Sequence, residues 1–138
     1  MTQEEAQNTL AALDAEPYIS LMTFKRDGSG VETPVWHARV DDAFYVFTES
    51  KAYKVKRLRR DPHARIAACG VVGAVHGEWH EAQASILDTD RSEDKEKERR
   101  AYEALDKKYG WQMRAANLFS KLAGRFNARA MLEIRLEE

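Results

Sequence analysis

Basic side chains dominate one short stretch of the chain, and their arrangement suits the binding of an anion. The stretch, residues 51–60, follows an apolar run, begins after Ser50 and ends before Asp61 and Pro62. Serine is a favoured N-cap residue and the position before a proline disfavours helix, so the sequence predicts a helix over about 51–60 that Ser50 caps. Three apolar residues, Ala52, Val55 and Leu58, form a narrow stripe between the cations Lys51, Lys54, Lys56, Arg57, Arg59 and Arg60.

Two of these cations lie near the end of the helix at which positive charge is unfavourable. Lys51 and Lys54 are in or beside the first predicted turn, and the N-terminus of a helix already carries a partial positive charge. A phosphate held by the free amides of that turn would stabilise both lysines. A charge run is more often a solvated face of a helix, but here the strands that precede it favour a phosphate site.

The other reactive side chains form no convincing site. Cys69 is the single cysteine and lies in an apolar run, so we interpret it as a buried small residue. His76 and His80 are four residues apart without a third ligand at suitable spacing, which favours loop or surface histidines. The acidic residues between Asp88 and Asp94 lack the spacing of a calcium loop and indicate the start of a helix. We therefore predict no metal site and name no catalytic residue.

Turn signals and the apolar periodicity predict a mainly β, α+β domain. Asp27 and Gly28 are typical of a hairpin turn, and Pro34 indicates an edge strand or an interrupted ladder. The expected strands are 18–24, 31–40, 43–48, 63–69, 78–87 and 128–136. The expected helices are 2–16, with Thr2 and Glu5 at capping-box spacing, then 51–60, 88–109, with Thr89 or Ser92 as cap and Gly110 at its end, and 112–122. Six antiparallel strands favour a small barrel, because closure removes unpaired edges.

Composition limits the class of protein. The 138 residues suit a single domain spanning 1–138, with 43% hydrophobic and 9% aromatic residues. The formal net charge of −1 does not suit a general nucleic-acid binder. No apolar run is long enough for a membrane span, and the first residues do not resemble a signal peptide, so we expect a cytoplasmic protein without a membrane partner.

The motifs resemble those of a known family when they are taken together. Thr33-Pro-Val-Trp36, the run from Phe44 to Thr48, Ser50 and the basic helix are similar to the flavin-binding split barrels related to pyridoxamine 5'-phosphate oxidase. Within that group, the closest resemblance is to the small deazaflavin (coenzyme F-420)-dependent proteins, of which Lys107-Lys-Tyr-Gly110 is also typical. The resemblance covers nearly the whole chain.

The resemblance implies a six-stranded split barrel that forms a homodimer, with flavin mononucleotide (FMN) or F-420 at the subunit interface. By position, Thr33, Pro34, Val35 and Trp36 would line the ring system, largely through backbone groups. Phe47, Thr48 and Ser50 would follow the ribityl chain. Lys54 would pair with the phosphate, and Lys56 or Arg57 would supply a second cation. A dimer would also cover apolar area around Trp36 and Trp79.

Two departures limit what the resemblance implies about activity. Glu32 and His37 occupy positions at which the oxidase pattern has an arginine and a lysine, and the substrate-binding pattern of the last strand is missing. We therefore expect an oxidoreductase that transfers hydride between the bound cofactor and a small organic substrate, and not vitamin oxidation. A non-catalytic cofactor carrier is the main alternative. Haem binding or breakdown is the third, with His37, His76 or His80 as axial candidates.

Overall fold

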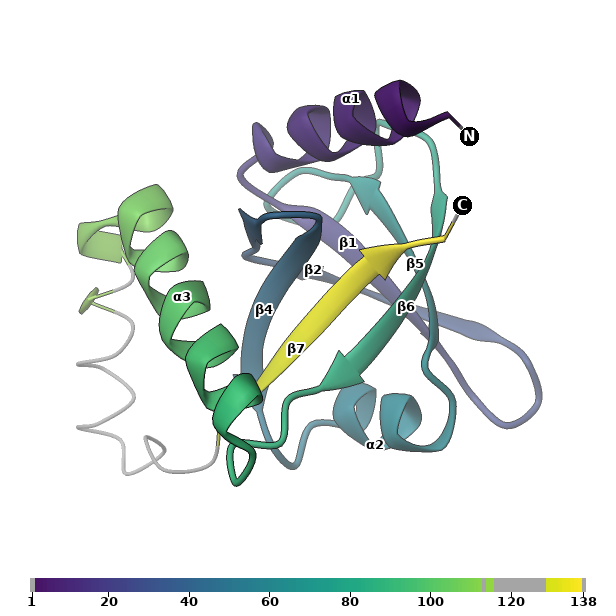
Figure 1. Cartoon of the computed structure of the whole chain (residues 1–138). Helices are drawn as coiled ribbons and strands as arrows, with labels where there is room; N and C mark the ends of the chain where they lie inside the picture. The colour runs from purple at the N-terminus through teal and green to yellow at the C-terminus, as the bar shows by residue number, and fades with distance from the viewer. Residues whose placement is uncertain (1, 113, 116–128, 138) are drawn as a thin grey trace.

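The computed structural model describes residues 2–112, 114–115 and 129–137, which form a curled antiparallel sheet with helices around it (Figure 1). The helices are α1 (Gln3–Asp14), α2 (Tyr53–Arg60) and α3 (Ser92–Tyr109). The strands are β1 (Ile19–Phe24), β2 (Gly30–Val35), β3 (Ala38–Val40), β4 (Ala43–Glu49), β5 (His63–Ala68), β6 (His80–Ile86) and β7 (Arg129–Leu136). No helix in these ranges is both long enough and apolar enough to cross a membrane.

The strand order β2-β1-β5-β6-β7-β4-β3 places β2 and β3 at opposite edges of the sheet. Only Trp36 and His37 separate these two strands in the chain, and a link of this length spans at most about 11 Å. The two edges must therefore lie close together, so the sheet curls into a barrel. The prediction of one strand over 31–40 was wrong: the chain changes direction at Trp36 and His37, and its two halves pair with different strands. The sheet consequently has seven strands in place of six.

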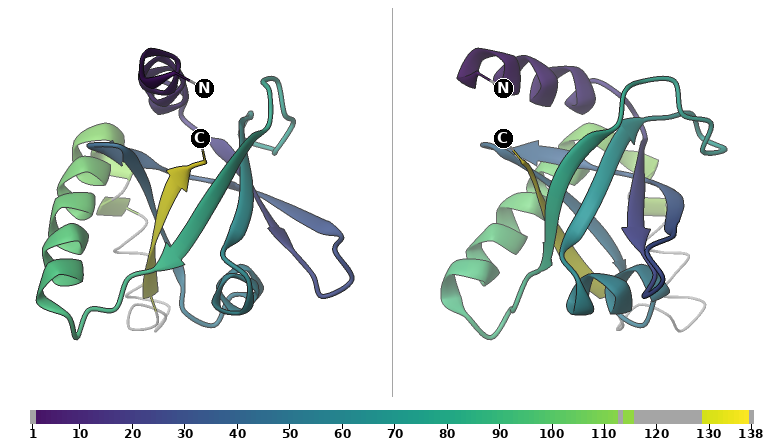
Figure 2. Two further views of the ribbon diagram at one scale, coloured as in Figure 1. Left: turned by 45° about the vertical axis from the view of Figure 1, so that its right-hand side comes forward. Right: turned by 90° about the vertical axis from the view of Figure 1, so that its right-hand side faces the viewer.

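Alternation along the strands separates the barrel interior from its outer face. On β4, Phe44 and Val46 point into the interior core, whereas Ala43 and Tyr45 belong to an outer cluster beneath α3. Helices α1 and α2 lie at opposite ends of the barrel (Figures 1 and 2). The buried side chains through which they enter the interior core are Leu10 and Leu13 of α1, and Val55 and Leu58 of α2.

The helix ends agree with the sequence in some places and differ in others. The Thr2 hydroxyl accepts a hydrogen bond from the Glu5 amide at 3.1 Å, which confirms the predicted cap of α1. Gly110 ends α3 at φ 56°, also as predicted. The predicted cap of α3 was wrong, because Arg91 occupies the N-cap position without a side-chain bond. The helix predicted over 112–122 falls largely outside the described residues.

Candidate functional site

Two strand edges lack a partner among the described strands, and both border the break between β2 and β4 in the barrel wall. Strand β2 pairs only with β1, so its other edge is unpaired. Strand β3 covers β4 only as far as Tyr45, which leaves the edge from Val46 to Glu49 unpaired on that side. Unpaired edges present amide and carbonyl groups that can bind a ligand. Pro34 lies on the β2 edge, which agrees with the edge position that a missing amide donor predicts.

The residues predicted to line a ring system occupy the end of β2. Thr33 is partly buried and its hydroxyl donates to the Leu21 carbonyl at 3.4 Å, whereas Pro34 is exposed. Val35 is buried in the interior core, so only its backbone could face a ligand. The Trp36 ring is partly buried and stacks on Tyr109, with ring centroids 4.6 Å apart and an interplanar angle of 12°. This contact belongs to the outer cluster, so Trp36 packs as a core aromatic on one face.

A pocket of about 320 Å³ lies beside Trp36 and contains residues for which no site role was predicted from the sequence. Its polar lining includes Tyr18, Lys108 and Tyr109. The Tyr109 hydroxyl accepts from the His37 amide at 2.9 Å and lies within hydrogen-bond distance of two carbonyls, of Pro17 and of His37 itself. Burial raises the pKa of Tyr109 to about 12, so the hydroxyl keeps its proton. Tyr109 therefore connects the end of α3 to the link between β2 and β3 by hydrogen bonds. No local sequence pattern indicated this contact.

His37 is fully buried and does not suit the role of an axial haem ligand. Its Nε2 atom lies 2.6 Å from the Leu13 carbonyl, to which it donates. Burial, together with the positive charge of Lys108, lowers the pKa of His37 to about 4, so the ring is neutral at pH 7. A ring in this position is out of reach of a haem bound at the surface.

The second part of the predicted site lies where β4 ends and α2 begins. Phe47 is partly buried between the Tyr102 ring, at 6.1 Å, and the Arg129 guanidinium, at 4.8 Å from the ring centroid. Thr48 and Ser50 are also partly buried. Ser50 does not cap the helix as predicted: α2 begins two residues later, and Ala52 occupies its N-cap position without a side-chain bond.

Lys54 is the second residue of α2 and is partly buried among other cations. Burial lowers the pKa of Lys54, and the charge of Arg57 lowers it further, although Glu49 opposes the shift. Arg57 is partly buried and donates to the Thr23 hydroxyl at 3.3 Å, whereas Lys56 is exposed over the Tyr53 ring. Across the described residues, no carboxylate forms an ion pair with any of the six cations from Lys51 to Arg60. Apart from the charge of Glu49 near Lys54, no close carboxylate balances the positive charge of this helix in the described residues, which fits an anionic ligand.

The predicted residues form two groups at opposite ends of the barrel. Trp36 lies beside the end of α1, because it shares a pocket with Ala15 and Pro17. Lys54 belongs to α2, which closes the other end. Strand β4 runs between these two ends of the barrel, and its length is about 20 Å at a rise of roughly 3.3 Å per residue. Only an elongated ligand could therefore touch both groups, and a ring carrying a ribityl phosphate is elongated in this way.

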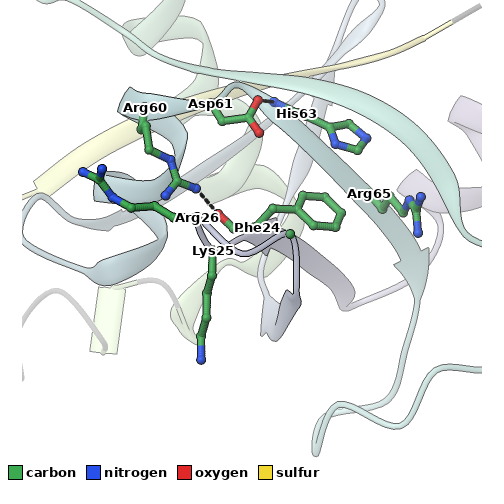
Figure 3. A pocket seen from close by; sticks show the side chains of 8 residues that line it. Phe24, Lys25, Arg26, Arg60, Asp61, His63 and Arg65 are labelled. Atoms are coloured by element: carbon green, nitrogen blue, oxygen red, sulfur yellow. Dashed lines mark hydrogen bonds between the residues drawn. The ribbon is translucent and has the colours of Figure 1, made fainter.

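A larger pocket, about 500 Å³ in volume, lies at the C-terminal end of α2 and contains none of the predicted site residues (Figure 3). Among the described residues, no group of histidine, cysteine and acidic side chains is arranged to hold a metal. Cys69 is buried, as its apolar neighbourhood predicted, and burial raises the pKa of its thiol.

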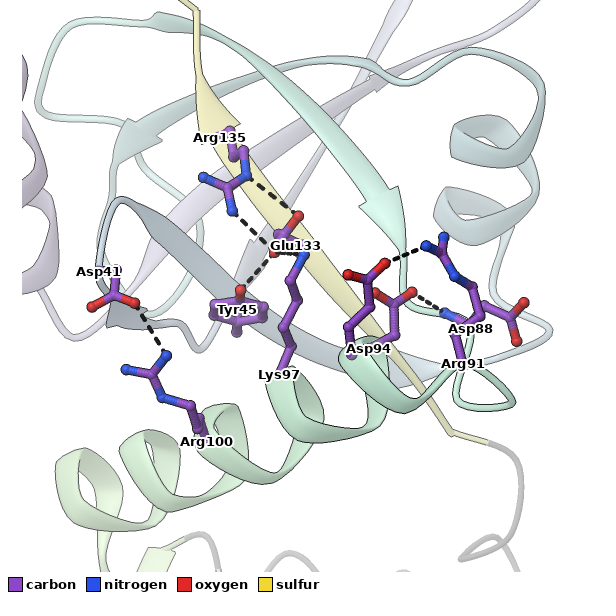
Figure 4. A network of polar contacts seen from close by, with 10 residues as sticks. Asp41, Tyr45, Asp88, Arg91, Asp94, Lys97, Arg100, Glu133 and Arg135 are labelled. Atoms are coloured by element: carbon purple, nitrogen blue, oxygen red, sulfur yellow. Dashed lines mark hydrogen bonds and ion pairs between the residues drawn. The ribbon is translucent and has the colours of Figure 1, made fainter.

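Helix α3 is held against the sheet by a polar network around Glu133 (Figure 4). The Tyr45 hydroxyl donates to Glu133 at 2.6 Å, and the Lys97 ammonium lies 3.2 Å from the same carboxylate oxygen. Burial alone would raise the pKa of Glu133, but these hydrogen bonds and the charge of Arg135 hold it below its usual range. Asp94 accepts from the Asp88 amide at 2.8 Å, so this carboxylate stabilises the start of the helix. The network positions α3 and hence Tyr109 beneath Trp36.

Solved structures that resemble this one come from proteins with different ligands. A candidate pyridoxamine 5'-phosphate oxidase of Listeria innocua is 12% identical over 97% of this chain and 94% of its own, with a TM-score of 0.60. An FAD-binding protein of Mesorhizobium loti is 18% identical over 96% of this chain and 88% of its own, with a TM-score of 0.64. The haem storage protein HutZ of Vibrio cholerae is 12% identical over 100% of this chain and 92% of its own, with a TM-score of 0.64. No protein-family model and no curated protein matches the sequence.

At these identities the similarity concerns the fold. It confirms the predicted mainly β split barrel, with seven strands where six were expected. The similar structures include flavin-binding and haem-storing proteins, so the fold alone does not select the ligand. The chain thus has the split-barrel fold of the flavin-binding proteins related to pyridoxamine 5'-phosphate oxidase.

Proposed function

We propose that the protein binds a flavin or deazaflavin, FMN or F-420, and transfers hydride between this cofactor and a small organic substrate. The observation that carries the proposal is the row of predicted residues along the two unpaired edges, which ends at the cations of α2 that have no carboxylate partner. A ligand with a planar ring, a polar chain and a phosphate matches this row in length and in the order of its chemical groups.

The protein's own groups would bind and orient the cofactor. The amides of the first turn of α2 and the Lys54 ammonium would hold the phosphate, with Arg57 as a second cation. The hydroxyls of Thr48 and Ser50 would contact the ribityl chain, and backbone groups of residues 33–36 would contact the ring edge. When bound, the cofactor supplies the hydride chemistry, and the protein supplies orientation and exclusion of water. The Tyr109 hydroxyl keeps its proton and is occupied by backbone partners, so we assign it a positioning role.

A homodimer would complete the site. Large apolar side chains are exposed at Tyr53 (73%), Val71 (65%), Val72 (87%) and Trp111 (73%), and exposed apolar surface favours association. Tyr53 is the first residue of α2, next to Lys54, which puts one of these side chains beside the proposed phosphate site. Sedimentation velocity at micromolar concentration tests this part of the proposal, and a stable monomer would contradict it.

Haem storage is the second candidate function, because HutZ has a similar fold. With His37 buried, His76 and His80 are the histidines left from the predicted axial set. His76 lies 3.7 Å from Glu16, and His80 lines a pocket of only about 220 Å³ between α1 and β6. His76 is exposed beside the Glu16 carboxylate, and the pocket at His80 is smaller than the roughly 300–1,000 Å³ of typical ligand pockets, so we favour the flavin proposal.

The visible spectrum of the purified protein, followed by titration with FMN, F-420 and haem, tests the choice of cofactor. We expect FMN or F-420 to bind and haem not to bind. The reduced cofactor is then mixed with a panel of small organic acceptors: consumption supports an enzyme, whereas retention without turnover supports a carrier. Tight binding of haem, with no binding of either flavin-type cofactor, would overturn the proposal.

A further inference from the structure

The pocket at the C-terminal end of α2 has the features of a second ligand site, separate from the proposed flavin site. It lies between the β1–β2 hairpin, the last residues of α2 and the start of β5, and measures about 500 Å³ (Figure 3). Arg60 follows Lys54 by six residues, which corresponds to about 9 Å along a helix axis. Two ligands could therefore occupy the two ends of α2 together.

One wall of this pocket is a stacked pair of rings. The centroids of Phe24 and His63 are 4.6 Å apart, with an interplanar angle of 3°. The orientation of His63 is supported by Glu81, whose Oε1 lies 2.9 Å from Nε2 of the ring. Aromatic faces stack favourably on planar groups, and a pair already held in register loses little freedom on binding. The Arg65 guanidinium also lies over the Phe24 ring, at 5.6 Å from its centroid, so a planar ligand ring would stack on the face of His63 that points away from Phe24.

The rest of the lining carries more positive than negative charge. Arg65 is neutralised by Glu81, to which its Nε donates at 2.6 Å, and the pKa of Glu81 is lowered by its bonds to His63 and Arg65. The other charged side chains that line the pocket are three cations, Lys25, Arg26 and Arg60, and one carboxylate, Asp61. Asp61 accepts from the His63 amide at 3.1 Å, and the Arg60 guanidinium donates to the Phe24 carbonyl, so both side chains are held in place.

We propose that this pocket binds an organic phosphate that carries an aromatic ring, of which nucleoside phosphates are the simplest class. The ring would lie against the Phe24–His63 pair, and the phosphate groups would contact Arg26 and Arg60. In the view of Figure 3, these two arginines lie on one side of the Phe24 ring and Arg65 lies on the other. A solvated basic surface would attract any polyanion equally, whereas this pocket requires both the ring and the charge.

Calorimetric titration of the full-length protein with three probes tests the proposal: adenosine diphosphate, adenosine and inorganic pyrophosphate. The diphosphate should bind at least about tenfold more tightly than either fragment, because each fragment lacks one set of contacts. Arg26→Ala should weaken diphosphate binding about tenfold. Phe24→Leu should weaken the binding of the diphosphate and leave the binding of pyrophosphate unchanged. Arg59→Ala is the control, because it also removes one exposed arginine charge, but from a position of α2 that lines another pocket.

Three results would overturn the inference: pyrophosphate binding as tightly as the diphosphate, equal losses from Arg26→Ala and Arg59→Ala, or no binding of the diphosphate at millimolar concentration. FAD and FMN distinguish two sources of the nucleotide. If the pocket binds the nucleotide half of a dinucleotide, Arg26→Ala should weaken the binding of FAD and leave the binding of FMN unchanged. If the pocket binds a free nucleotide, Arg26→Ala should change the binding of neither flavin. Lys54→Ala should leave the diphosphate unaffected, so this inference and the proposed flavin site can fail independently.

Discussion

Replacing Lys54 with alanine should weaken FMN binding about 10- to 100-fold while the fold is retained. The side chain is partly buried at the start of α2 and interacts with the charge of Glu49, but it forms no ion pair with a described carboxylate, so its removal breaks no such pair within the protein. A charge-assisted hydrogen bond to a phosphate contributes roughly 1.5–3 kcal/mol, and 1.4 kcal/mol corresponds to a factor of ten. We expect the lower half of this range, because Lys54 remains partly in contact with solvent.

Arg59→Ala is the matched control, since it removes the same charge from an exposed position of the same helix. At about 10 Å in water, one pair of unit charges interacts by about 0.4 kcal/mol. For a doubly charged phosphate at physiological ionic strength, screening reduces the total to about 0.2 kcal/mol, which is less than a twofold change in affinity. The control thus separates a direct contact from the general field of the basic helix.

Quenching of flavin fluorescence measures both variants with FMN and with riboflavin, which has no phosphate. The Lys54→Ala loss should largely disappear with riboflavin, because the lost contact is to the phosphate. If Lys54→Ala binds FMN as tightly as the parent, or loses no more affinity than Arg59→Ala, then α2 is a solvated basic helix and the phosphate assignment is wrong.

Three further predictions follow from the packing. Tyr109→Phe should lower the free energy of unfolding by about 1–3 kcal/mol, because the buried His37 amide loses its acceptor; an unchanged urea midpoint would contradict this. The pKa of His37 is about 4 in the fold, against an ordinary value of 6.5. The contribution of the neutral ring to the free energy of unfolding is therefore fully present above pH 6.5, and roughly 3 kcal/mol of it is lost as the pH falls toward 4. Histidine NMR should then show one ring that stays neutral at pH 5, and a His37 ring titrating near 6.5 would refute the assignment. Val71→Ser combined with Val72→Ser should shift the proposed dimer toward monomer in sedimentation, because two exposed apolar side chains are replaced by polar ones; an unchanged dimer fraction would contradict a role of these residues in the interface.

Features that depend on neighbours in the sequence could be predicted. The Thr2 cap needs only an amide three residues later. The stop of α2 before Pro62 and the end of α3 at Gly110 have local backbone causes of the same kind. The basic character of α2 was also visible, although the position of its first turn was not.

Features that depend on distant strands were decided only by the tertiary structure. The chain breaks at Trp36 and His37 because two different strands, β1 and β4, offer pairing partners to its two halves, and no local pattern encodes that choice. The hydrogen bond from the His37 amide to Tyr109 joins residues 72 positions apart, and the Phe24–His63 stack joins the end of one strand to the start of another. Residue types and local spacing were readable from the chain, but which side chains meet was set by long-range strand register and by the packing of α3 on the sheet.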